Sequence, residues 1–88
     1  MGYLVKEIQP TPNPNAAKFI LDGEISDRPI SFLNAEQGRD HPTACQLFAV
    51  QGVTSVLLLG NFVTINKRSD VEWQAITQKV QEILQKCR

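Results

Sequence analysis

Residues 53–66 read VTSVLLLGNFVTIN and decide the fold of this chain. Two runs rich in Val, Leu and Ile flank a central Gly60-Asn61 pair, and such runs are typical of β-strands. Gly and Asn accept the positive φ angles that a two-residue hairpin turn requires. We therefore predict two antiparallel strands, over residues 53–59 and 62–66.

A long amphipathic helix is predicted after this hairpin. Apolar residues recur at helical spacing, at Trp73, Ile76, Val80, Ile83 and Leu84. The preceding residues 69–72, Ser-Asp-Val-Glu, have the pattern of a capping box, in which the first and last side chains bond each other's backbone amides. The apolar face of the helix needs a partner, and the hairpin offers one.

The rest of the chain predicts three further strands and a short helix. β-forming residues favour strands over residues 3–8, 17–21 and 29–33, whereas residues 34–40 lose all hydrophobic character and indicate a loop. Pro42 suits the first position of a helix, with the polar His41 before it as a cap. This helix would bury Ala44, Leu47 and Phe48 and end at Gly52. We predict a two-layer α+β fold, with four to five antiparallel strands covered by the short and the long helix.

Composition limits the classes of function. The 88 residues suit one domain, residues 1–88, with 42% hydrophobic and 20% charged side chains. Nine Lys and Arg residues balance nine Asp and Glu residues, so the broad positive field of a nucleic-acid-binding protein is missing. The first residues lack the apolar run of a signal peptide or membrane span. We expect a cytoplasmic monomer that binds neither nucleic acid nor membrane.

Prolines alternate with small polar residues at Pro10, Pro12 and Pro14. Each proline fixes its own φ angle and favours extended geometry in the residue before it. Residues 9–14 are therefore predicted to form a stiff surface segment rather than a helix or a central strand.

Four blocks of this sequence resemble the N-terminal domain of Nfu/NifU-type iron–sulfur cluster scaffold proteins. They occur in the same order and at compatible spacing, and are Thr11-Pro12-Asn13-Pro14-Asn15-Ala16 with Lys18-Phe19-Ile20, Leu47-Phe48 with Gly52-Val53, Phe62-Val63-Thr64-Ile65, and Asp70-Val71-Glu72-Trp73. Family members commonly carry Leu and Ser where this chain has Ala17 and His41, so the cap of the short helix is expected to differ.

The resemblance implies a non-enzymatic accessory or protein-interaction module in iron–sulfur cluster assembly. In full-length scaffolds of this type a CxxC motif in a separate C-terminal domain holds the cluster, and this sequence contains no such motif. The chain alone is therefore expected to bind no cofactor, and a cluster is implied only through a partner. The expected partners are iron–sulfur assembly or recipient proteins.

Seven residues are candidates for binding such a partner: Thr11, Pro12, Asn13, Pro14, Asn15, Lys18 and Trp73. A rigid segment loses little entropy on binding, which favours recognition by residues 11–15. The alternative is architectural, because prolines block edge pairing and Asn side chains cap local backbone groups. Trp73 is expected to pack on the core or, if partly exposed beside Phe48 or Phe62, to anchor an interface.

The metal-binding alternative involves His41, Cys45 and Cys87. His41 and Cys45 are four residues apart and would supply two ligands on one helix face, but two ligands do not complete a site. We expect a small buried Cys45 and an exposed Cys87 near the chain end, and a homodimer that pools both cysteines remains the alternative. Lys67-Arg68 is interpreted as a solvated turn, or else as an anchor for an acidic partner. No nucleophile and base are placed by a recognisable motif, so no enzymatic activity is expected.

Overall fold

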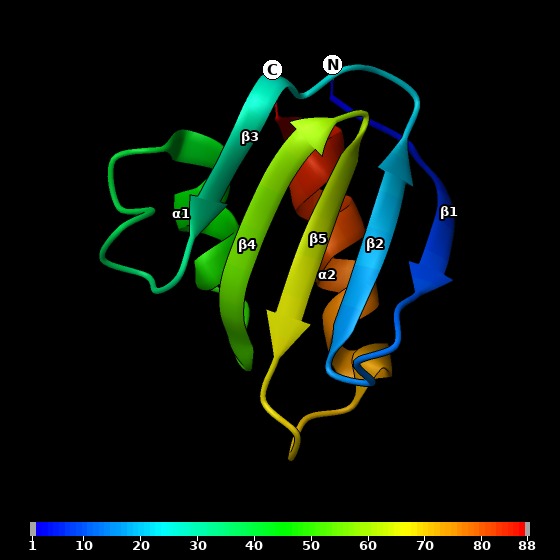
Figure 1. Ribbon diagram of the computed structural model, residues 1–88, viewed down its shortest axis with the longest axis vertical. Helices are drawn as coiled ribbons and strands as arrows, with labels where there is room; N and C mark the ends of the chain where they lie inside the picture. Colours follow the sequence, from blue (N-terminus) through cyan, green and yellow to red (C-terminus); the bar gives the residue numbers. More distant parts are fainter. Residues whose placement is uncertain (1, 88) are drawn as a thin grey trace.

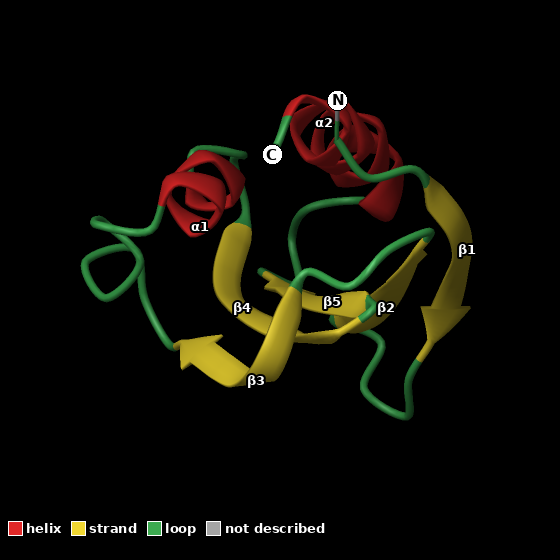
Figure 2. Ribbon diagram, turned by 90° about the horizontal axis from the view of Figure 1, so that it is seen from above, coloured by secondary structure: helices red, strands yellow, loops and turns green. Residues whose placement is uncertain are grey.

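The computed structural model describes residues 2–87 and has one antiparallel sheet with both helices on the same face (Figures 1 and 2). The elements in chain order are β1 Val5–Pro10, β2 Ala16–Leu21, β3 Ser26–Phe32, α1 Pro42–Phe48, β4 Val53–Gly60, β5 Phe62–Lys67 and α2 Trp73–Lys86. The five strands follow the order β1-β2-β5-β4-β3 across the sheet. The predicted two-layer α+β fold is confirmed. Met1 and Arg88, the ends of the predicted domain, lie outside the described residues.

The predicted hairpin is formed by β4 and β5 in the middle of the sheet. Leu59 pairs with Phe62 across the Gly60-Asn61 turn, and Val56 pairs with Ile65 further along. Gly60 has φ +56°, a left-handed conformation that glycine adopts without steric cost. The hairpin thus supplies the two strands on which the rest of the sheet is assembled.

The core lies between the sheet and α2. Side chains on alternate strand positions point to this face, as the period of a β-strand requires, and bury Phe19, Leu58 and Ile65 completely. The predicted stripe of α2 covers them with Ile76, Val80 and Leu84, whereas Trp73 and Ile83 are only half-buried. None of the helices within residues 2–87 has the length and apolar character needed to cross a membrane.

The short helix α1 begins as predicted, with an imidazole as its cap. The Ala44 amide donates to Nδ1 of His41 over 3.2 Å, and Pro42 occupies the first turn. Ala44 and Leu47 are buried and Phe48 is half-buried. The helix ends at Phe48, and Gly52 takes φ +98° in the turn that leads into β4.

Two predicted strands differ from the observed ones by more than one residue at an end, whereas the other three differ by a single residue. β1 runs over residues 5–10 rather than 3–8, and β3 over residues 26–32 rather than 29–33. Both are edge strands, and each contains a proline, Pro10 or Pro29. Proline is tolerated there because the backbone on the outer side of an edge strand needs no hydrogen-bond donor.

The predicted capping box is wrong. Helix α2 begins at Trp73, Glu72 is its N-cap, and no side chain caps the helix. Residues 68–71 form a turn instead, because the Val71 amide donates to the Arg68 carbonyl oxygen over 3.3 Å. Val71 also packs closely on Gly52, where a Cβ atom would lie 2.9 Å from its side chain. This contact fixes the turn against the α1–β4 connection.

The core assignment predicts a contrast between two leucines. Leu58→Ala removes a fully buried side chain, and we expect the free energy of unfolding to fall by about 2–5 kcal/mol. Leu33, with 69% of its surface exposed, is the matched control, and Leu33→Ala should change stability by less than about 0.5 kcal/mol. Urea unfolding measures both. Similar losses for the two variants would contradict the assignment.

Candidate partner-binding groove

The segment of residues 11–15 connects β1 to β2 and is held first by its own hydrogen bonds. The Thr11 hydroxyl accepts a hydrogen bond from the Asn13 amide over 3.2 Å. Its proton is shared between the carbonyl oxygens of Asn13, at 2.9 Å, and Ala16, at 3.0 Å. The Asn13 side chain in turn accepts a hydrogen bond from the Asn15 amide over 2.9 Å. The segment is therefore a turn with a defined shape, and Asn13 performs the local capping that the architectural alternative expected of Asn13 and Asn15.

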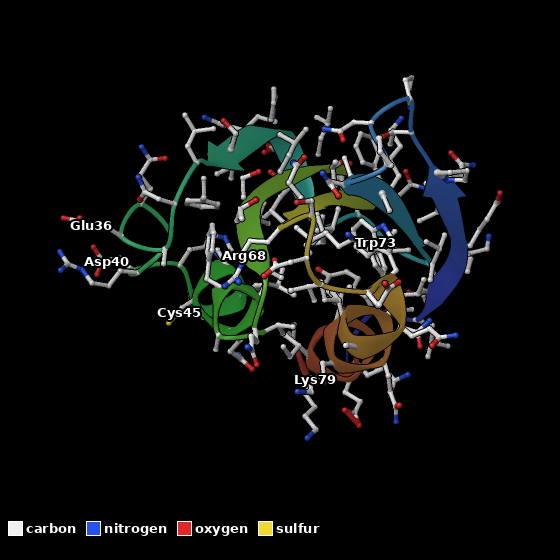
Figure 3. The ribbon with its side chains drawn as sticks, turned by 90° about the horizontal axis from the view of Figure 1, so that it is seen from below. Glu36, Asp40, Cys45, Arg68, Trp73 and Lys79 are labelled. Atoms are coloured by element: carbon white, nitrogen blue, oxygen red, sulfur yellow. The ribbon has the colours of Figure 1, made fainter. Side chains whose placement is uncertain are left out.

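Trp73 connects this segment to the helix layer. Its indole Nε1 donates to the Pro14 carbonyl oxygen over 3.0 Å, although 59 residues separate the two in the chain. The aromatic ring that approaches Trp73 is Phe19, with centroids 6.3 Å apart, rather than the predicted Phe48 or Phe62. Figure 3 shows Trp73 near the first turn of α2. Partial exposure, the condition for an interface anchor, is met because the ring is half-buried.

A groove of about 380 Å³ lies between the segment, the end of β1 and the start of α2. Its lining is mainly apolar and consists of Ile8, Pro10, Thr11, Asn13, Pro14, Ala16, Ala17, Trp73 and Thr77. Ile8 exposes 38% of its surface there. Four of the seven predicted partner-binding residues therefore line one concave surface, while Pro12 and Asn15 lie next to it in the segment.

Lys18 is not part of this groove. It alternates with the buried Ala17 and Phe19 along β2, so its side chain lies on the sheet face that the helices leave open. Its ammonium lies 4.6 Å from the centroid of the Phe62 ring. The structure thus separates Lys18 from Trp73, on opposite faces of the sheet.

Lys67 is the residue that sequence reasoning missed. It was interpreted as part of a solvated turn, but it ends β5 and exposes only 9% of its surface. Its Nζ donates to Asn15 Oδ1 over 3.2 Å and to the Arg68 carbonyl oxygen over 3.2 Å. The signal was available, because position 67 continues the alternation of Val63 and Ile65 toward the core face.

Arg68, by contrast, lies in the exposed turn that was predicted. Its Nε donates to Oδ1 of Asp70 over 3.0 Å, and a second bond joins the same two side chains. This hydrogen bonding lowers the pKa of Asp70 and raises that of Arg68. The pair stabilises the fold at neutral pH and loses this contribution as acid protonates Asp70, and the exposure of both side chains keeps the contribution small.

The metal-ligand candidates occupy separate environments, and both cysteine burial predictions are reversed. Cys45 is exposed on α1, where Figure 3 shows it on the outer side of the helix. Cys87 is buried after the end of α2, and its Sγ donates to the Ile83 carbonyl oxygen over 3.0 Å. The His41 ring packs on Phe32 at a centroid distance of 5.4 Å, and its Nδ1 is occupied by the helix cap.

Comparison with known proteins identifies the family. The model of the family described as scaffold protein Nfu/NifU N terminal matches residues 5–87. This chain belongs to the Nfu/NifU N-terminal family. The sequence-based resemblance is thereby confirmed over almost the whole chain.

Two groups of relatives of this Nfu/NifU chain are informative. The mitochondrial NFU1 iron–sulfur cluster scaffold homologues of Drosophila erecta and human are 34% and 33% identical over 76 residues, or 84% of this chain. The match spans only 27% and 30% of those relatives. A NifU-like protein from Saccharomyces cerevisiae is 28% identical with a TM-score of 0.78, over 94% of this chain and 77% of the yeast chain. A Staphylococcus aureus protein, 21% identical with a TM-score of 0.73 over 91% of this chain and 96% of its own, shares the fold.

The candidate metal ligands of this Nfu/NifU chain do not form a group among residues 2–87. Within residues 2–87 no group of three or more His, Cys, Asp and Glu side chains is arranged to hold one. A dimer that pooled both cysteines would need the Cys87 thiol at its surface, whereas that thiol is buried and bonded to α2.

The two thiols should differ sharply in reactivity. In native protein, the exposed Cys45 should react rapidly with Ellman's reagent and release about one equivalent of the reagent's coloured thiolate. The buried Cys87 should release a second equivalent only after unfolding in guanidinium chloride, because the reagent must reach a thiol to react with it. Cys45→Ser should remove the rapid phase, and Cys87→Ser should preserve it. Two equally rapid phases in the native protein would contradict the observed burial of Cys87.

Proposed function

We propose that this chain is a non-enzymatic protein-interaction module of iron–sulfur cluster assembly. It binds an assembly or recipient protein through the segment of residues 11–15 and Trp73. Family membership supports the pathway, since the relatives carry the name iron–sulfur cluster scaffold. The chain spans less than a third of the length of those relatives, so their activity as whole proteins enters here only as part of the proposal.

One observation carries the proposal: hydrogen bonds hold the backbone of residues 11–15, while several of its side chains remain exposed to solvent. The Trp73–Pro14 hydrogen bond and the internal bonds of Thr11 and Asn13 fix the backbone. The side chains of Pro12, Asn13 and Pro14 are nevertheless exposed. A segment that is already ordered loses little conformational entropy when a partner binds, which favours affinity.

The groove beside the segment adds apolar contact area. Its apolar surface is provided by the side chains of Ile8, Pro14 and Trp73, which lie next to exposed polar groups of the segment. Half-buried aromatic residues beside such a hollow are frequent anchors of protein interfaces. A purely architectural role for the prolines would explain the turn but would require neither the groove nor the exposed Ile8.

In this mechanism the iron–sulfur cluster is cargo that a partner carries. The chain's own residues orient the partner and supply no ligand to the cluster. No enzymatic step and no contact with nucleic acid is part of the proposal. A cytoplasmic location also belongs to it, and it contrasts with the mitochondrial location in the names of the NFU1 relatives.

Affinity capture with a matched pair of variants tests the proposal. We expect the tagged wild-type chain to recover iron–sulfur assembly or recipient proteins, identified by mass spectrometry, from iron-replete cells. Ile8→Asp places a charge in the groove and should reduce their recovery at least about tenfold, because a buried unpaired charge is costly. Leu33→Asp is the control at another exposed leucine-sized site and should recover them normally.

Two outcomes would contradict the proposal. The first is that wild-type protein recovers no protein of this class, and the second is that Ile8→Asp recovers as much as Leu33→Asp. Thermal unfolding of each variant verifies that lost recovery does not come from lost folding.

A further inference from the structure

Lys67 is the most unusual side chain next to the groove. Lysine is almost never buried in proteins unless it is paired, yet Lys67 exposes only 9% of its surface. The other lysines within residues 2–87 are exposed or half-buried. The environment of this ammonium group therefore calls for an explanation.

The groups that contact it directly are neutral and come from three parts of the chain. The Nζ atom donates to Asn15 Oδ1 and to the Arg68 carbonyl oxygen, each over 3.2 Å. It also lies 5.5 Å from the centroid of the Trp73 ring, within the range of a cation–π contact. The ion pairs recorded among residues 2–87 do not include Lys67. The pKa of Asp70, lowered mainly by its hydrogen bond with Arg68, is lowered further by the Lys67 charge, but the recorded direct contacts of the ammonium are all with neutral groups.

All of these contacts lie at the end of the segment that is formed by Pro14 and Asn15. The Lys67 backbone amide donates to the Asn15 carbonyl oxygen over 2.8 Å, so Asn15 is held by both its backbone and its side chain. The neighbouring Pro14 is held by the indole of Trp73, over which the Lys67 ammonium lies. Lys67 therefore contacts Asn15 directly and also contacts Trp73, the residue that holds Pro14.

We propose that Lys67 is a positioning residue that shapes the groove before any partner arrives. Its ammonium sets the orientation of the Asn15 amide and the Trp73 ring, and through them the course of residues 11–15. The consequence for partner binding rests on the function proposed above. The effect on the order of the segment stands without it.

Lys67→Met removes the ammonium group and retains an unbranched apolar side chain of similar length. We expect the amides of Asn15 and Ala16 to exchange with deuterium about tenfold faster than in wild-type protein, as the loss of one or two hydrogen bonds implies. Fluorescence of Trp73, the single tryptophan, should become about twofold easier to quench with acrylamide, since the Pro14 bond holds it less firmly. Lys79→Met, at an exposed position of α2, is the matched control and should alter neither signal.

Asn15→Asp distinguishes a role of the Lys67 charge from a role in which Lys67 only fills space, because only the charge should change the effect of the new carboxylate. With Lys67 present, the new carboxylate gains a charge-assisted bond, and exchange of the Ala16 amide should slow about threefold. In the Lys67→Met background the same carboxylate is unpaired, and exchange should accelerate. The opposite signs support the inference. Equal effects in both backgrounds, or unchanged exchange in Lys67→Met, would overturn it.

Capture of iron–sulfur proteins then separates the two proposals. If wild-type protein recovers them, Lys67→Met should recover about tenfold less, and equal recovery would overturn the role of Lys67 in binding. If wild-type protein recovers none, the proposed function fails, while the exchange data still decide whether Lys67 positions the segment.

Discussion

The packing of α2 on one face of the sheet is the constraint from which the other features follow. Ile76, Val80 and Leu84 are completely buried against strand residues that point to the same face. A sheet of this size is stable only when one face is covered, and within residues 2–87 α2 is the only helix long enough to extend along the strands (Figure 1). The position of α2 therefore fixes where its first residue lies.

That first residue, Trp73, lies beside the connection between β1 and β2 as a result. The indole is then within reach of Pro14, and the same region receives the end of β5 with Lys67. Local bonds of Thr11 and Asn13 define the turn, but the contacts that attach it to the fold come from residues more than fifty positions away. The groove is thus a product of tertiary packing, made from segments that the sequence places far apart.

Periodic patterns made much of the fold predictable. The apolar runs on either side of Gly60-Asn61 predict a hairpin, and the spacing of Ile76, Val80 and Leu84 predicts a helix, without any knowledge of the neighbouring elements. The start of α2 was less predictable, because a local capping pattern competed with the packing of Val71 on Gly52. The burial of the two cysteines also depended on which helix face met the sheet, and a residue near a chain end is not thereby exposed.

The sequence predicts the segment of residues 11–15 but not the contacts from Lys67 and Trp73 that hold it. The prolines predict a stiff surface segment, and Trp73 belongs to a block that resembles the family. No local sequence pattern indicates that residue 15 contacts residue 67. A charged residue at the end of a strand is usually solvated, so the inward direction of Lys67 had to be read from the strand period. Lys18, although close to the segment in sequence, points to the opposite face.

The central claim is that residues 11–15 keep one shape in the free protein, held by the sheet and α2. Backbone ¹⁵N relaxation measures this directly at the amides of Thr11, Asn13 and Asn15. We expect order parameters of about 0.85 for these amides, equal to those of β5. Values below about 0.6 would show a flexible loop on the ps–ns timescale and would contradict the account.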